Sequence, residues 1–100
     1  MLKEIERNDW GSFFESFTMA HDHWPVHIDG EKESLPLEGI VARDVRIVIH
    51  LGGDIRHHRV ITIDAARVTV GQTGGLDEEV AIESTDGHIT RLRLRAPVAE

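Results

Sequence analysis

The first regular hydrophobic pattern in the chain runs from Asn8 to His21 and has the period of an α-helix. Four aromatic residues recur there at i, i+3, i+4 and i+7: Trp10, Phe13, Phe14 and Phe17. This spacing places four of the five aromatic residues of the protein on one helix face, which Ala20 extends. We predict a helix of about three turns, with Asn8 as its N-cap. The aromatic face is expected to fill the core, and a partner-binding helix is the alternative.

After His21 the period changes from 3.6 to 2, which is typical of half-buried β-strands. We predict strands over residues 24–28, 45–51, 55–63, 68–70, 79–83 and 89–95, and a short strand or extended loop over 40–42. Turns are expected at 29–34, 52–54, 74–75 and 85–87, and a break at 64–66. Because such short connections join antiparallel neighbours, the sequence predicts an α+β fold. Its N-terminal helix packs on a curved antiparallel β-meander of five to seven strands, with closure into a partial barrel left open.

The register of two hairpins follows from their patterns, because a slip of one residue exchanges the two faces of a strand. A three-residue loop at 85–87 places Val80 opposite Leu92 and Glu79 opposite Arg93, with Gly87 in the left-handed conformation. The same reasoning makes 52–54 a three-residue loop, with Val45 opposite Ile61. That register gathers four polar residues on the outer face of this hairpin: Arg46, His50, Arg56 and His58.

Length and composition restrict the class of protein. One hundred residues make a single domain, 1–100, with one hydrophobic core. The net charge of −7 argues against nucleic acid as a partner. No apolar stretch approaches the roughly 20 residues of a membrane span, no signal peptide is evident, and cysteine is absent. We therefore expect a cytoplasmic protein without a membrane association.

The four residues Arg46, His50, Arg56 and His58 are the candidate ligand-binding residues. Arginine is suited to phosphates and carboxylates because it offers two parallel donors. A metal site is not predicted, since two histidines lack a third ligand and the neighbouring arginines would repel a cation. No cofactor is expected. A polar solvent-exposed face is the competing interpretation, and His21 is expected to complement the negative C-terminal end of the helix.

Two further patterns have structural explanations. Three arginines alternate along the last strand, Arg91, Arg93 and Arg95, and we expect them to form a cross-strand charge ladder with Asp77, Glu79 and Glu83 rather than an anion site. No serine has the strand–turn–helix context of a nucleophile elbow, and the paired glycines lack the following helix of a phosphate loop. No catalytic residue is therefore predicted.

The opening segment carries a motif over residues 4–17: Glu4-Ile5-x-Arg7-x-x-Trp10-x-x-Phe13-Phe14-x-x-Phe17. It resembles the opening of a bacterial family of short proteins catalogued as a domain of unknown function. Residues 36–40 and 86–95 are similar to the middle and closing parts of that family. The resemblance spans nearly the whole chain and implies a single domain. It implies no catalytic or ligand-binding residue.

Three functions remain open at this stage. The leading hypothesis is a non-enzymatic binding or structural module that forms a homo-oligomer through a sheet edge. It is favoured because turns, register and charge pairing account for most polar residues. The first alternative is a small-anion or metal binder that uses the histidine and arginine cluster. The second is a small enzyme with an unrecognised acid/base pair.

Overall fold

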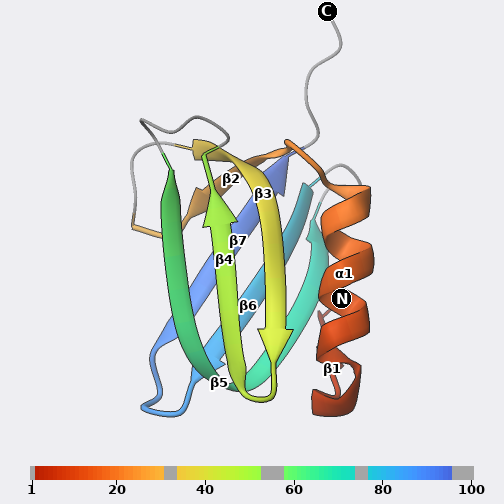
Figure 1. The fold of residues 1–100 in the computed structure, drawn as a ribbon, viewed down its shortest axis with the longest axis vertical. Coiled ribbons are helices and arrows are strands. Elements are labelled where there is room, and N and C mark those ends of the chain that lie inside the picture. The colour runs from red at the N-terminus through yellow and green to blue at the C-terminus, as the bar shows by residue number, and fades with distance from the viewer. Residues whose placement is uncertain (1, 31–33, 53–57, 74–76, 96–100) are drawn as a thin grey trace, which may run out of the picture.

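The computed structural model of the protein describes residues 2–30, 34–52, 58–73 and 77–95. Within these residues, one helix and seven strands follow one another (Figure 1), with a 3₁₀ turn before the helix: β1 (Leu2–Ile5), η1 (Arg7–Asp9), α1 (Trp10–Ala20), β2 (Pro25–Ile28), β3 (Ser34–Arg43), β4 (Arg46–Leu51), β5 (Arg59–Thr73), β6 (Asp77–Ser84) and β7 (Ile89–Arg95). The predicted helix is confirmed, and so is an antiparallel series of strands after it, but the strands predicted at 55–63 and 68–70 belong to the single strand β5, and β1 was not predicted. The segment predicted as a short strand at 40–42 belongs to the longer strand β3.

Strands β2 to β7 form an antiparallel meander that closes on itself. Each strand pairs with the next along the chain, and β7 pairs back with β2 through Val26 opposite Leu94. The result is a closed six-stranded barrel with β1 as an additional strand beside β5, which confirms the α+β class and shows a ring where closure was left open. Closure pairs the first and last strands of the meander, which would lie at the two edges of a flat sheet.

Strand β5 is long because it changes partners along its length. Its first half pairs with β4, as in Ile61 opposite Ile49, and its second half pairs with β6, as in Val68 opposite Ile82. The predicted break at 64–66 is wrong, because the strand continues through a bulge between Ala65 and Arg67. Beyond the bulge, the edge that faced β4 pairs with β1 instead.

The two predicted registers have different outcomes. In the last hairpin Val80 lies opposite Leu92 and Gly87 has φ +92°, both as predicted. In the β4–β5 hairpin the prediction is wrong by four residues, because Ile61 lies opposite Ile49 rather than Val45. A shift by an even number of residues keeps every side chain on its face, so the hydrophobic pattern does not distinguish the two registers. Within the predicted loop and strand start, residues 53–57 lie outside the described residues.

The helix begins one residue later than expected. Asn8 lies inside η1, where the Asp9 N–H donates to the Glu6 carbonyl, and Asp9 occupies the N-cap position without a side-chain hydrogen bond. The predicted cap at Asn8 is therefore wrong. Trp10, Phe14 and Phe17 are buried as predicted, whereas Phe13 is half-buried and Ala20 is exposed.

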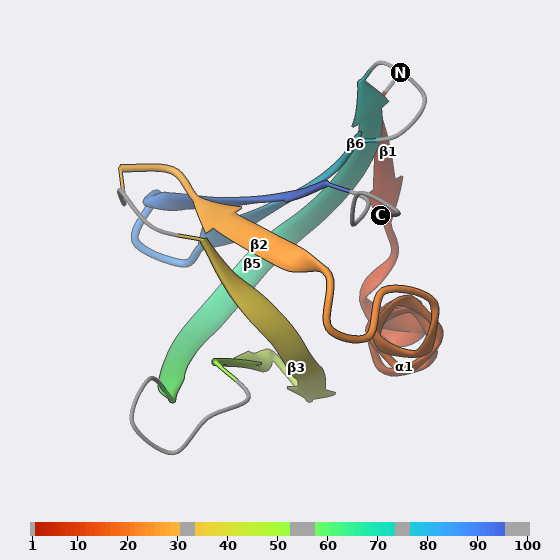
Figure 2. The same cartoon turned by 90° about the horizontal axis from the view of Figure 1, so that it is seen from above.

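Helix α1 lies between β1 and β3 at one side of the barrel (Figure 2). The Trp10 indole donates to the Ile5 carbonyl at 2.8 Å, and the Ile40 N–H donates to Thr18 Oγ1 at 3.1 Å. The buried rings join aliphatic side chains from the barrel strands in one core: Val26, Leu37, Ile40, Ile47, Ile49, Leu51, Ile63, Val68, Val80, Ile82, Leu92 and Leu94. One helix therefore covers the space between the added strand and the barrel.

Candidate functional site

The predicted cluster on the outer face of the β4–β5 hairpin divides into two parts. His50 and His58 are neighbours, with ring centres 5.9 Å apart. Arg46 lies four residues away along β4, about 13 Å at the rise of a β-strand. Its Nε is 3.2 Å from Asp64 Oδ1 on β5. Arg56 lies outside the described residues. The two histidines are neighbours even though the predicted register of the β4–β5 hairpin was wrong. A register shift by an even number of residues leaves each side chain on the same face of the sheet.

A carboxylate that the sequence analysis did not select contacts one of the two histidines, His58. Glu38 Oε2 lies 3.0 Å from His58 Nδ1. Glu38 is the extra residue of a bulge in β3, because Leu37 pairs with Leu51 while Gly39 pairs with His50. Bulges direct a side chain away from the regular alternation of a strand. The sequence signal for Glu38 was therefore the break in the alternation of apolar and polar residues at 37–39. A period-2 pattern does not assign the residues of such a break to either face of the strand.

The Glu38, His50 and His58 group has the donor atoms of a metal site, in an open arrangement. Two imidazoles and one carboxylate are ligands of zinc and of related divalent transition metals. Within residues 2–30, 34–52, 58–73 and 77–95, however, no group of three or more His, Asp or Glu side chains could hold a metal ion. The three side chains come from β3, β4 and the residue before β5, and those of Glu38 and His58 are 32% and 44% exposed.

Exposed apolar side chains collect on the same side of the barrel. Among the described residues, four large hydrophobic side chains are strongly exposed: Met19 at 78%, Val60 at 48%, and Val41 and Ile89 at 45% each. Val41 lies directly opposite the half-buried Val48 on the outer face of β3 and β4, and Val60 on β5 lies opposite His50. Met19 and Val41 line one shallow groove between α1 and β3. We name the surface of Met19, Val41, Val48 and Val60 the valine face.

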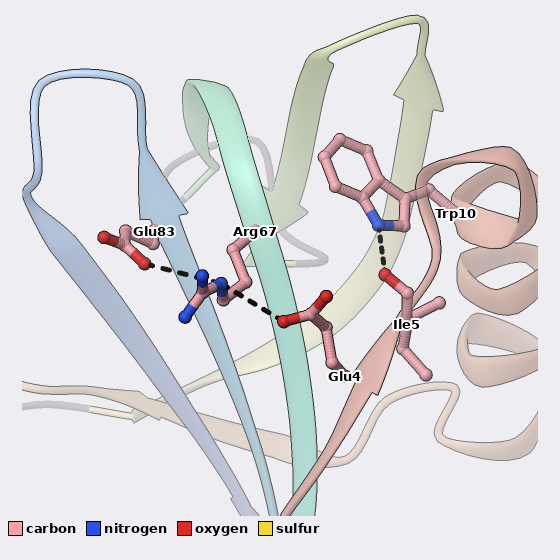
Figure 3. Close-up of polar contacts among 5 residues, drawn as sticks. All are labelled: Glu4, Ile5, Trp10, Arg67 and Glu83. Carbon is pink, nitrogen blue, oxygen red and sulfur yellow. Dashed lines mark hydrogen bonds and ion pairs between the residues drawn. The ribbon is translucent and has the colours of Figure 1, made fainter.

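The outer surface of the other half of the barrel carries charges. Arg67 Nε on β5 lies 3.2 Å from Glu4 Oε1 on β1 and 4.0 Å from Glu83 Oε2 on β6 (Figure 3). Arg91 on β7 lies 3.6 Å from Glu79 and 3.9 Å from Asp29. We name this surface, formed by Glu4, Arg67, Glu79, Glu83 and Arg91, the ionic face.

Only part of the predicted charge ladder is seen among the described side chains, and both acidic residues seen there have partners other than those expected. Glu79 lies opposite Arg93 in the register, as expected, but its ion pair is with the diagonal Arg91. Glu83 pairs with Arg67 on the other neighbouring strand. The Asp77 side chain lies outside the described part of the chain. The Arg91 side chain is 46% exposed and that of Glu79 23%, so each pair contributes only a few tenths of a kcal/mol.

His21, for which the sequence predicted a structural role, lies at the C-terminal end of α1. His21 is the C-cap residue of α1, and its Nδ1 lies 2.8 Å from the Phe17 carbonyl oxygen. The ring stacks on Phe17 with centres 4.2 Å apart and meets the edge of Trp24 at 4.5 Å. This position at the negative end of the helix is the one expected from the sequence. His21 closes the end of the aromatic core and is 7% exposed.

Two further results bear on the function of the protein. The described part of the chain contains no helix with the length and apolar character needed to cross a membrane. Comparisons with protein-family models, with curated proteins and with solved structures returned no match for this chain. The family resemblance read from residues 4–17 therefore stays a prediction, and function has to be argued from the two outer faces and the histidine group.

Proposed function

We propose that this protein is a non-enzymatic binding module that self-associates through the valine face. The observation that carries the proposal is the placement of exposed apolar side chains. Three of the four that are strongly exposed in the described residues lie on this one face or in its groove: Met19, Val41 and Val60. A gathering of apolar residues beside polar ones marks interaction surfaces, whereas scattered single residues do not.

The charges bordering the valine face suit a contact between two copies. In a twofold contact the same patch meets itself, so an unpaired charge would meet its like. Arg46 is paired with Asp64 within one chain, and Glu38 contacts His58. Each copy therefore brings a local pair of opposite sign, Arg46 with Asp64, to the rim of the contact. The ionic face, in contrast, would lose the hydration of five charged side chains on burial.

Two of the sheet edges are a poorer route to self-association than the valine face. In the described strands, β1, the end of β3 beyond Leu37 and the first half of β5 each have an edge without a strand neighbour. Helix α1 lies between the edges of β1 and β3 (Figure 2), and the Thr18 hydroxyl already accepts a hydrogen bond from the Ile40 N–H. At those two edges an incoming strand would have to displace the helix, which carries the buried rings of the core.

The proposal is tested by sedimentation velocity over a wide range of protein concentrations. The wild-type protein is expected to increase in mean mass with concentration, and Val41→Glu is expected to remain a monomer because a carboxylate would be buried in the contact. The matched control is Ile89→Glu, since Ile89 has the same 45% exposure but lies at the start of β7. Ile89→Glu should behave as the wild type does. A wild-type protein that stays monomeric at the highest concentration would contradict the proposal.

A further inference from the structure

We infer that two copies of this protein meet with twofold symmetry, so that Glu15 on α1 of each copy pairs with Arg43 on β3 of the other. The inference rests on the proposed self-association and adds to it the residues that orient the two copies. Its basis is a pair of opposite charges that border the groove of the valine face and have no partner within the described part of their own chain.

Helix α1 and strand β3 contain three charged residues: Glu15, Glu38 and Arg43. Glu38 contacts His58 at 3.0 Å. Glu15 and Arg43 are both exposed, and in the described part of the chain neither side chain takes part in an ion pair or a side-chain hydrogen bond. These two charges are therefore available to another molecule.

Both residues lie beside the exposed apolar side chains of the valine face. Glu15 lines the groove between α1 and β3 together with Met19, Val41 and Ala42. Arg43 is two residues beyond Val41, so alternation along the strand places it on the same outer side, about 7 Å further along β3. The burial pattern agrees, since Val41 and Arg43 are exposed and Ala42 between them is half-buried. An acid and a base thus border the same apolar patch, one on the helix and one on the strand.

The charges around Arg43 within its own chain do not neutralise it. Arg46 lies directly opposite Arg43 in the β3–β4 register, and like charges in this position repel each other. The nearby acids already have other partners. Asp64 is paired with Arg46, and Asp44, the residue after Arg43, is paired with Arg7 at 2.6 Å. A carboxylate from a second molecule would therefore relieve the repulsion.

A twofold contact matches Glu15 and Arg43 in both directions. In such a contact residue i of one copy meets residue j of the other, and j meets i. A charge on the axis would meet its own equivalent, whereas two opposite charges on either side of the axis meet each other. One acid and one base on the same patch therefore form two ion pairs across the contact. A second copy of this chain supplies the matching charges, and this complementarity fixes the orientation of the two copies.

The test is a charge-reversal series followed by sedimentation velocity at low salt. Glu15→Arg places arginines against each other across the contact, and Arg43→Glu places glutamates against each other. Each variant alone should self-associate at least about tenfold more weakly than the wild type, because like charges in a contact repel. The double variant restores both ion pairs and should self-associate as the wild type does. The matched control is Arg93→Glu, which changes the net charge as Arg43→Glu does but lies at an exposed position of β7. It should behave as the wild type does.

A mixture of the two single variants gives the most specific readout. One variant brings two basic residues to the contact and the other brings two acidic residues, so an equimolar mixture should form heterodimers although neither variant self-associates well alone. High salt should weaken these heterodimers, because it screens the ion pairs. Amide NMR spectra of the separate variants should match the wild type away from the substituted residue, since Glu15 and Arg43 are exposed.

The two proposals fail in different ways. A wild-type protein that stays monomeric contradicts the self-association and this inference together. If the wild type self-associates and Val41→Glu does not, but both single charge variants behave as Arg93→Glu does, the inference is overturned and the contact through the valine face stands. The same conclusion follows if the mixture contains no more of the heavier species than the separate variants do.

Discussion

The two outer faces of the barrel are built on the same core and differ in what they show to solvent. The valine face on β3, β4 and the first half of β5 has exposed apolar side chains at its centre and single ion pairs at its border. The ionic face on β1, the second half of β5, β6 and β7 has arginines that each contact two carboxylates. Strand β5 belongs to both faces, so one continuous strand carries both kinds of surface.

The contrast shows which features serve the fold and which do not. On both halves the inward side chains are aliphatic and buried, as in Ile49 on β4 and Ile82 on β6. The barrel therefore needs neither the exposed valines nor the ion pairs for its interior. Exposed ion pairs contribute little to stability, and exposed valines contribute little as well. The proposed contact between two copies rests on this difference between the faces.

The largest expected effect is on the free energy of unfolding, which should fall when a core residue is truncated and should barely change when a residue of the valine face is truncated. Phe14→Ala should lower the free energy of unfolding by about 3–5 kcal/mol, because it removes a fully buried ring and leaves a cavity. Val60→Ala, which changes an exposed side chain of the valine face, should change it by less than about 0.5 kcal/mol. Urea unfolding followed by tryptophan fluorescence measures both. A cost for Val60→Ala comparable to that of Phe14→Ala would make the face part of the fold and break the comparison.

A smaller effect on the free energy of unfolding is expected when one arginine of either face is removed. Arg67 contacts two carboxylates and Arg46 contacts one, and their side chains are 61% and 62% exposed. Arg67→Ala and Arg46→Ala should each cost less than about 1 kcal/mol, and the difference between them should vanish at high salt. Urea midpoints at low and high NaCl concentration test this. A loss of several kcal/mol that persists in salt for Arg67→Ala would show that the ionic face stabilises the fold.

The smallest effect concerns the turn that ends the ionic face. The Ser84 hydroxyl donates to the Asp86 carboxylate, and the His88 N–H donates to it at 3.1 Å. The Ser84 hydrogen bond is the main cause of a lowered Asp86 pKa. Because the folded pKa lies below the unfolded one, this contribution to stability is present above the unfolded pKa and is lost as pH falls through the folded pKa.

Ser84→Ala should therefore raise the Asp86 pKa toward its ordinary value. An NMR titration of the Asp86 carboxyl carbon in both proteins measures the two midpoints. Equal midpoints would show that the hydroxyl does not determine the titration of this turn. Thr85→Ala, at the neighbouring exposed position, is the control and should leave the midpoint unchanged.

The parts of the fold that the sequence predicted are those with two independent signals. The last hairpin has apolar residues on one face and opposite charges on the other, and both select the register with Val80 opposite Leu92. The helix has its aromatic spacing and a change of period at His21. In the β4–β5 hairpin only the hydrophobic face was informative, so a shift of four residues was invisible.

Other features depend on contacts between distant parts of the chain. Closure joins Val26 to Leu94, and no local pattern specifies which strands meet in this way. Strand β1 has four residues, which is too few to establish a period. Glu38 is the extra residue of a bulge in β3. A bulge breaks the alternation of side chains that is used to assign residues to a face. The candidate site was therefore found in part, with its histidines predicted together and its carboxylate missed.

The most direct test of the central claim compares amide NMR spectra of the wild-type protein at low and high concentration. The account predicts concentration-dependent shifts at Met19, Val41, Val48 and Val60, with Arg67, Glu83 and Arg91 unchanged. Shifts confined to the ionic face, or spectra that do not change with concentration, would contradict the claim that the valine face is the surface through which two copies meet.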